Sequence, residues 1–198
     1  MEILVATHNS KKRQELKTLL KGFKSVEVLN FDDIDIEPPV IIEDGKTFRQ
    51  NAVKKAVTTS KFFNGLVLAD DSGLEVDALG GKPGVRSARF ARIKATDDEN
   101  NQKLLKLLEN TPEKERTARF VCNIALAEGG VLLESFEGTA EGKIRIKPRG
   151  KNGFGYDPLF VPKGHELTFA EMAASKKNGI SHRGRALKQL KKEVKKYI

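Results

Sequence analysis

The chain has 198 residues, enough for one large domain or two small lobes with a substantial core, and 32% of its residues are charged. It contains no apolar run near the roughly 20 residues of a membrane-spanning helix. The single cysteine, Cys122, excludes an internal disulfide and is expected to be a small core residue. Three histidines without paired metal-ligand spacing argue against zinc. The net charge of 36 − 27 = +9 indicates an anionic partner, either nucleic acid or a polyphosphate small molecule.

The first predicted elements are a strand over residues 3–6 and a helix that follows it directly. Apolar residues spaced at i, i+3, i+4 and i+7 define the inward face of the helix, which should end near Gly22: Leu16, Leu19, Leu20 and Phe23. No positively charged leader precedes the strand, so we expect a cytoplasmic protein without a membrane partner.

The turn between this strand and helix is rich in hydrogen-bond donors. It reads Thr7-His8-Asn9-Ser10-Lys11-Lys12-Arg13, with Asn9 or Ser10 as the N-cap. Backbone N–H groups, hydroxyls and ammonium groups at a helix N-terminus suit a phosphate, although a capped helix with a basic first turn would have the same composition. The turn lacks the glycines and the Gly-Lys-Ser/Thr ending of a Walker loop.

A second strand is predicted over residues 26–29, and Thr47 with Gln50 forms a capping box for a helix over residues 48–63. The residues expected on one face of that helix are Phe48, Ala52, Ala56 and Phe63. Glu43 lies in the turn before the helix. It is either a surface acid or an additional metal ligand, if the helix packs beside the acidic pair that follows.

That acidic pair ends the most informative stretch of the chain. Residues 66–69 are apolar and predict a buried strand, which runs into Asp70-Asp71 and then into a turn at Ser72-Gly73. Two neighbouring carboxylates repel each other and are costly to desolvate unless a cation compensates, so they suggest a hard metal such as Mg²⁺. A solvated Asp-Asp-Ser-Gly turn is the alternative.

The middle of the chain changes from helical to strand periodicity. Thr96 with Glu99 starts another amphipathic helix, which ends near residues 110–112. From Thr117 the period is two, and a hairpin turn at 128–130 returns the chain through residues 131–138, with a further short exposed strand over 143–147. The expected sheet is therefore mixed, with an antiparallel hairpin on a partly parallel core.

The C-terminal third holds two more polar segments. Gly153-Phe154-Gly155-Tyr156-Asp157-Pro158 presents two aromatic rings that either stack on a planar base or belong to the core. Thr168 with Glu171 caps a short helix through Ala174. Residues 175–185 read as a loop dense in donors before a last helix, whose apolar residues face inward and whose lysines form a solvated face: Leu187, Leu190 and Val194 inward, and Lys188, Lys191, Lys192, Lys195 and Lys196 outward.

Taken together, these motifs resemble the inosine triphosphate pyrophosphatase family. Five segments carry the resemblance from the first strand to the last helix: 6–12, 68–74, 80–89, 153–158 and 180–184. One departure is His8, where many members of that family have Gly; it should leave phosphate binding by the turn intact and change loop packing.

The resemblance implies a fold and a reaction. The implied fold is an elongated two-lobed α/β structure with a long twisted mixed β-sheet flanked by helices, an active-site cleft between the lobes, and residues 1–198 acting as a single domain in a homodimer. The implied reaction is Mg²⁺-dependent hydrolysis of deaminated purine nucleoside triphosphates (ITP, dITP and XTP) to the monophosphate and pyrophosphate, which would keep non-standard purines out of nucleic-acid precursors.

The resemblance also implies roles for individual residues. Asp71 is the catalytic residue and, with Glu43, a ligand of Mg²⁺, whereas the role of Asp70 stays open. The remaining candidates bind substrate: Thr7, His8, Asn9, Ser10, Lys11, Lys12, Ser72, Phe154, Gly155, Tyr156, Asp157, Lys177, His182 and Arg183.

Base selection follows from hydrogen bonding. Hypoxanthine and xanthine carry an acceptor, O6, where adenine carries an amino donor, so fixed donors from His182, Arg183 or adjacent backbone N–H groups would be left unpaired by adenine at a cost of roughly 1–3 kcal/mol. The sequence does not explain how guanine is excluded. Two other functions fit parts of the sequence: a basic nucleic-acid-binding module, which leaves the acidic pair unexplained, and a pyrophosphatase for modified pyrimidine nucleotides.

Overall fold

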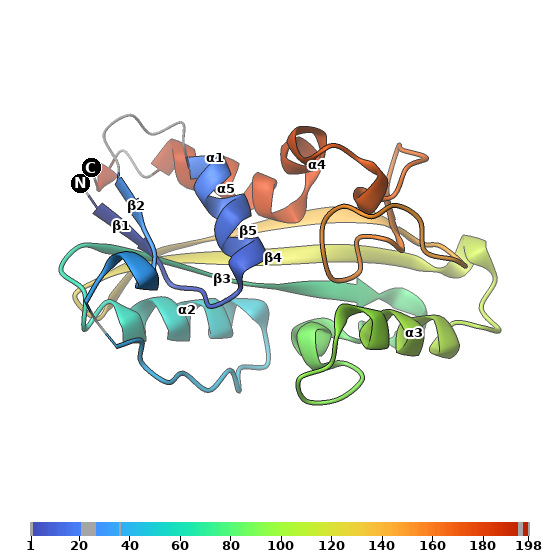
Figure 1. The fold of residues 1–198 in the computed structure, drawn as a ribbon, viewed down its shortest axis with the longest axis horizontal. Coiled ribbons are helices and arrows are strands. Elements are labelled where there is room, and N and C mark those ends of the chain that lie inside the picture. Colours follow the sequence, from blue (N-terminus) through green and yellow to red (C-terminus); the bar gives the residue numbers. More distant parts are fainter. Residues whose placement is uncertain (1, 21–26, 36, 194–195, 198) are drawn as a thin grey trace. The chain divides into compact units, whose positions relative to one another are not determined.

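The computed structural model describes residues 2–20, 27–35, 37–193 and 196–197 (Figure 1). The α-helices within these residues are α1 (Ser10–Leu20), α2 (Phe48–Thr59), α3 (Asp97–Leu107), α4 (Ala174–Ile180) and α5 (His182–Glu193). The strands are β1 (Glu2–Val5), β2 (Glu27–Leu29), β3 (Leu66–Val76), β4 (Thr117–Glu128), β5 (Val131–Ile144) and β6 (Phe160–Pro162). None of the helices in these ranges combines the length and the apolar character that crossing a bilayer requires.

The strands form one mixed sheet in the order β2-β1-β3-β4-β5-β6. Strand β1 is parallel to both of its neighbours, with Ile3 opposite Val28 of β2 and Leu66 of β3. Strand β6 is antiparallel to β5, with Val161 opposite Lys143. The expectation of a mixed sheet on a partly parallel core is therefore confirmed.

Contacts within the chain divide it into two compact units, and the strands β3, β4 and β5 contribute residues to both. Unit 1 comprises residues 1–71, 122–138 and 183–198, and unit 2 comprises residues 72–121 and 139–182.

In unit 1, helix α2 lies on one face of β1 and β3, and helices α1 and α5 lie on the other (Figure 1). Alternate residues of each strand pack against these two layers because strand side chains alternate between faces. Leu66 and Leu68 of β3 belong to an apolar cluster with residues of α1 and α5, the α1 and α5 cluster. Val67 and Ala69 belong to a second cluster with residues of α2, the α2 cluster. Cys122 is fully buried in the first of these clusters, as expected.

Unit 2 has its own core. Strand β3 contributes Leu74 and Val76, and helix α3 contributes Leu104 together with its C-cap residue Leu108. Phe120, Phe160 and Phe169 pack together as rings 4.8–6.0 Å apart. This core anchors α3 independently of the polar contacts at the N-terminus of that helix.

The largest correction to the sequence-based fold concerns β3. The strand was expected to end at the acidic pair and to turn at Ser72-Gly73, but it continues as an extended segment to Val76. The carboxylates do not end the strand because each has charged or polar partners that replace its hydration, as described below. The prediction of a strand tip was therefore wrong.

Other boundaries differ as well. Helix α2 ends at Thr59, although Phe63 still packs in the α2 cluster. Of the strand expected over 143–147, only residues 143 and 144 are extended, as the end of β5, and residues 145–147 belong to no strand. Thr168 caps a 3₁₀ turn at Phe169–Glu171, and residues 175–180 and 182–185, expected as loop, are helical, because each segment buries at least one side chain.

The capping boxes at Thr47, Thr96 and Thr168 are all present, with both reciprocal hydrogen bonds formed. Leu187 and Leu190 are buried, as predicted for the inward face of the last helix. The expectations for Gly22, Phe23, Val26, Val194 and Lys195 lie outside the described residues.

Candidate active site

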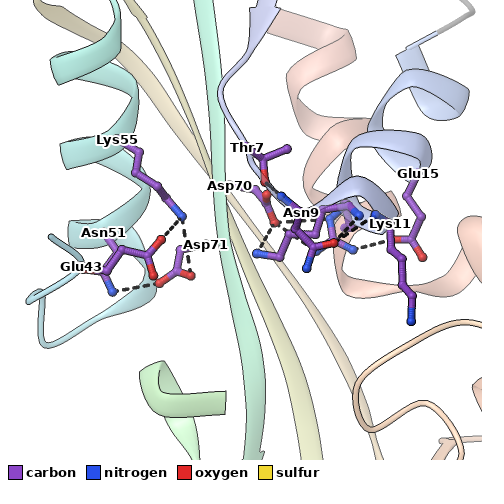
Figure 2. Close-up of polar contacts among 11 residues, drawn as sticks. Thr7, Asn9, Lys11, Glu15, Glu43, Asn51, Lys55, Asp70 and Asp71 are labelled. Atoms are coloured by element: carbon purple, nitrogen blue, oxygen red, sulfur yellow. Dashed lines mark hydrogen bonds and ion pairs between the residues drawn. The ribbon is translucent and has the colours of Figure 1, made fainter. Parts of the chain in front are cut away.

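The two acids of β3 point to opposite faces of the strand (Figure 2). Asp70 follows Leu66 and Leu68 on the face covered by α1 and α5, and Asp71 follows Val67 and Ala69 on the face covered by α2. Both are buried, with exposed fractions of 1% and 7%. The two carboxylates therefore do not form one shared site, and each has to be understood from its own neighbours.

Asp70 is held by two cations of unit 1. Its Oδ2 lies 3.2 Å from the Lys12 ammonium of α1 and 3.0 Å from the Arg183 guanidinium of α5. Burial alone would raise the pKa of Asp70, but Lys12 and Arg183 outweigh it and hold that pKa far below its usual range. Arg183 also pairs with Glu15 of α1. These contacts tie β3, α1 and α5 together.

The turn before α1 is ordered by its own side chains. Asn9 is the N-cap: its Oδ1 accepts hydrogen bonds of 3.0 Å from the backbone N–H groups of Lys11 and Lys12. Thr7 Oγ1 accepts from the Asn9 N–H at 3.2 Å, and the His8 ring stacks on Phe31 with centroids 5.1 Å apart.

This turn leaves its donors unequally placed. His8, Asn9, Ser10 and Lys11 are exposed, while Lys12 is directed to Asp70. Asn9 Oδ1 accepts from the backbone N–H groups of Lys11 and Lys12, so two of the N–H groups at the start of α1 are already hydrogen-bonded.

Asp71 lies among residues of α2 and the loop before it. The Asn51 side-chain amide donates to Asp71 Oδ2 at 2.9 Å, and the Lys55 ammonium lies 3.9 Å from Asp71 Oδ1. The same ammonium lies 2.6 Å from Glu43 Oε1 (Figure 2). Burial raises the pKa of Asp71, and the charge of Lys55 only partly opposes it. Asp71 is thus a buried carboxyl group whose pKa is raised, the direction in which burial shifts carboxyl groups at many functional sites.

The donor set around Asp71 fits a magnesium ion. No group of three or more His, Cys, Asp or Glu side chains in the described ranges could hold a metal by itself. Mg²⁺, however, keeps several waters and is bound by one or two carboxylates together with substrate phosphates. The carboxylates of Glu43 and Asp71 both lie near the Lys55 ammonium, so this position accommodates a positive charge.

In unit 2, the glycine-rich segment forms a second polar cluster. The Lys177 ammonium lies 2.6 Å from Asp157 Oδ2, and both side chains are buried. Asp157 Oδ2 also accepts from the Phe154 N–H at 2.9 Å. The same ammonium lies 5.0 Å from the centroid of the half-buried Phe154 ring. A cation and an aromatic face are therefore fixed next to each other by one carboxylate.

The other candidates of unit 2 differ in exposure. Tyr156 belongs to the core, where burial raises the pKa of its hydroxyl and the hydroxyl donates to the Ser87 carbonyl at 2.9 Å. The His182 ring is buried and stacks on Phe120 with centroids 4.7 Å apart. Ser72 is half-buried in β3. Phe154, rather than Tyr156, presents ring surface.

Sequence reasoning missed Asn51 and Lys55. They occupy positions i and i+4 of α2 and so lie on the same side of the helix, next to the buried stripe of Ala52 and Ala56. A polar pair at that spacing beside small buried residues was the available signal. Helix α2 packs beside β3, which is the condition under which Glu43 was expected to be a metal ligand, and that role stays a prediction.

The whole chain resembles known proteins. Residues 3–193 match the model of the Ham1 family. A dITP/XTP pyrophosphatase of Desulforamulus reducens is 50% identical over 96% of this chain and 93% of its own length, and one of Shouchella clausii is 49% identical over 98% and 96%. The structure of a HAM1 protein from Coxiella burnetii is 42% identical, with a TM-score of 0.88 over 99% of both chains. This chain belongs to the Ham1 family.

Proposed function

We propose that the protein is a nucleoside-triphosphate pyrophosphatase that hydrolyses ITP, dITP and XTP. In this reaction water adds to phosphorus, the anhydride bond between the α- and β-phosphates breaks, and the nucleoside monophosphate and pyrophosphate are released. The observation that carries the proposal is Asp71, a buried carboxyl with a raised pKa beside Lys55 and Glu43. Relatives named dITP/XTP pyrophosphatases, 49–50% identical over nearly the whole chain, support the same reaction.

In the proposed mechanism, Asp71 orients or deprotonates the attacking water. Glu43 and Asp71 are the residues that would hold Mg²⁺, which when bound would offset the charge of the phosphate oxygens. Lys55 supplies a further positive charge on the same face of β3. Asp70 is assigned a positioning role, because its contacts with Lys12 and Arg183 fix the strand that carries Asp71.

The triphosphate is assigned to the turn before α1 and to Lys177. Thr7, His8, Asn9, Ser10 and Lys11 supply hydroxyl, amide, imidazole and ammonium donors, with Lys12 behind them on Asp70. Anionic oxygens gain from several donors at a helix N-terminus. Ser72, the residue after Asp71, is assigned to the same substrate.

The purine is assigned to the glycine-rich segment and the start of α5. Phe154 provides the stacking face, Gly155 and Asp157 shape the backbone that presents it, and Tyr156 packs in the core of unit 2. We assign O6 to donors from His182, Arg183 or adjacent backbone N–H groups, of which the Arg183 guanidinium is already paired with Asp70 and Glu15. Adenine would leave such a donor unpaired, which costs roughly 1–3 kcal/mol.

We further propose that residues 1–198 act as one catalytic domain in a cytoplasmic homodimer. Coverage of nearly the full length of the relatives supports a single functional unit. The apolar side chains of Val40 and Ile42, 96% and 69% exposed, are candidates for the dimer interface. Light scattering of the purified protein measures the assembly.

The test of this function is a substrate panel. The protein is incubated with ITP, XTP, dITP, GTP and ATP, with and without Mg²⁺, and pyrophosphate and orthophosphate are measured separately. The proposal expects pyrophosphate from ITP, XTP and dITP only when Mg²⁺ is present. Release of orthophosphate instead would overturn it, and so would turnover of a modified pyrimidine triphosphate, added to the panel as a sixth substrate, with none of the purines. Failure of all turnover together with salt-sensitive DNA or RNA binding would favour the nucleic-acid module.

A further inference from the structure

Two side chains of helix α3 hold the backbone of Gly155, one at its N–H and one at its carbonyl. Its N–H donates to Asp97 Oδ2 at 2.8 Å, and its carbonyl accepts from the Asn101 side-chain amide at 2.9 Å. Asp97 and Asn101 are four residues apart on α3 and so share one face of the helix. All of these residues belong to unit 2.

The backbone on the other side of Phe154 is fixed as well. The Phe154 N–H donates to Asp157 Oδ2 at 2.9 Å, and the Phe154 carbonyl accepts from the Asp157 N–H at 3.2 Å. Gly153 has a φ of +74°, and a Cβ placed there would lie 2.0 Å from Asp157 Oδ2. A side chain at position 153 would therefore collide with the carboxylate that holds the Phe154 N–H, and the Phe154 ring is carried by a backbone with hydrogen bonds on both sides.

The N-terminus of α3 does not need Asp97 as a cap. Thr96 Oγ1 already accepts from the Glu99 N–H, and Glu99 Oε2 accepts from the Thr96 N–H at 2.7 Å. The helix is also anchored in the core by Leu104 and Leu108, which are fully buried. The contact of Asp97 with Gly155 is therefore separable from the folding of the helix.

We propose that Asp97 and Asn101 are positioning residues for recognition of the purine. By holding the backbone of Gly155, they preorganise the Phe154 ring for stacking, so nucleotide binding does not carry the free-energy cost of ordering this segment. This inference rests on the proposed function, in which Phe154 contacts the base. It places a determinant of nucleotide affinity on α3, a helix to which the proposed function assigns no substrate contact.

The inference is tested by steady-state kinetics with ITP and by inhibition with inorganic tripolyphosphate, which has no base. Asp97→Ala should raise KM for ITP roughly 3- to 10-fold, the scale of one lost hydrogen bond, with little change in kcat. The inhibition constant for tripolyphosphate should stay at the wild-type value. Asp97→Asn, which keeps an acceptor for the Gly155 N–H, should restore KM.

The matched control is Asp98→Ala, a neighbouring acid in the same first turn of α3 that is exposed. It changes the charge at the helix N-terminus equally and should leave KM unchanged. Asn101→Ala tests the contact with the Gly155 carbonyl in the same way. Thermal unfolding of each variant reports whether the fold is kept. If Asn101→Ala does not fold, the inference is judged on the Asp97 variants.

Equal KM values for Asp97→Ala and Asp98→Ala would overturn the inference while leaving the proposed function standing. A parallel rise in the inhibition constant for tripolyphosphate would also overturn it, because the effect would not act through the base. A wild-type protein that does not hydrolyse ITP would remove the proposed function and, with it, this inference.

Discussion

The same chemical change at two adjacent positions of β3 should affect stability at one position and activity at the other. Asp70→Asn and Asp71→Asn each replace a buried carboxylate by an amide of the same shape. Asp70 is ion-paired with Lys12 and Arg183, whereas Asp71 is desolvated with a raised pKa. We expect Asp70→Asn to lower stability strongly, and Asp71→Asn to remove activity without lowering stability.

The size of the Asp70 effect follows from its partners. Removing one member of a buried ion pair costs about 3–5 kcal/mol, because the other charge stays buried. Arg183 keeps Glu15, whose side chain is 17% exposed, and the Lys12 side chain is 15% exposed, so the lower end, about 3 kcal/mol, is expected. For a chain of this size that loss lowers Tm by about 6–12 °C.

The Asp71 effect divides differently between stability and rate. Lys55 keeps Glu43 at 2.6 Å in Asp71→Asn, so no cation is left without a partner. The substitution also removes a carboxylate whose burial disfavours the charged form. Stability in metal-free buffer should be unchanged or higher, while loss of a general base lowers kcat roughly 100- to 10,000-fold.

The pH dependence of stability has opposite signs at the two sites. The folded-state pKa of Asp70 is lowered, so its contribution is fully present above the unfolded value of about 3.9 and is lost as the pH falls below it. The folded-state pKa of Asp71 is raised, so its penalty exists above that pKa and is relieved as the pH falls through it. Both variants should therefore approach wild-type stability in acid, from opposite sides.

Urea unfolding in EDTA measures both free energies, and single-turnover hydrolysis of ITP with Mg²⁺ measures the rates. Equilibrium binding of ITP to Asp71→Asn should persist, because the phosphate and base contacts remain. Equal losses of stability in the two variants would refute the assignment of separate roles to the two faces of β3. Near-normal turnover by Asp71→Asn would refute its role as the base.

Three further outcomes are expected. Lys177→Met leaves the buried Asp157 carboxylate without the Lys177 ammonium at 2.6 Å and should cost about 3–5 kcal/mol of stability in urea unfolding; a loss below about 1 kcal/mol would show that the pair contributes little. Tyr156→Phe removes the hydrogen bond to the Ser87 carbonyl and should cost about 1 kcal/mol with kcat/KM for ITP unchanged, so a large kinetic defect would place the hydroxyl at the substrate. Burial raises the pKa of Cys122 to about 12, so a thiol reagent at pH 8 should label it only in denaturant, and rapid labelling of the native protein would contradict its place in the core.

Local signals in the sequence predicted much of the fold. The capping boxes at Thr47, Thr96 and Thr168 each involve residues three apart, so the physical interaction lies within the sequence window that reveals it. The mixed sheet followed from the change of period at Thr117 and from the strand–helix alternation before it.

The β3 strand could not be predicted in the same way, because its continuation depends on partners far away in sequence. Arg183 lies 113 residues from Asp70, and Asn51 lies 20 residues from Asp71. These partners cannot be recognised from the local sequence, in which an acidic pair after an apolar run resembles the end of a strand followed by a turn. The same limit applies to Lys55 and to the α3 contacts with Gly155, whose roles exist only once the elements have packed.

The central claim is that Glu43 and Asp71 bind the metal on the α2 face of β3, whereas Asp70 on the other face has a positioning role. Divalent-cation binding tests this claim most directly. Mn²⁺, a substitute for Mg²⁺ that can be followed by electron paramagnetic resonance, is titrated into the protein with a non-hydrolysable ITP analogue. Glu43→Gln and Asp71→Asn should weaken binding at least about tenfold, the scale on which even outer-shell changes act, whereas Glu15→Gln on the Asp70 face should bind as the wild type does. Wild-type affinity in Asp71→Asn, or a loss in Glu15→Gln alone, would contradict a metal site on the α2 face.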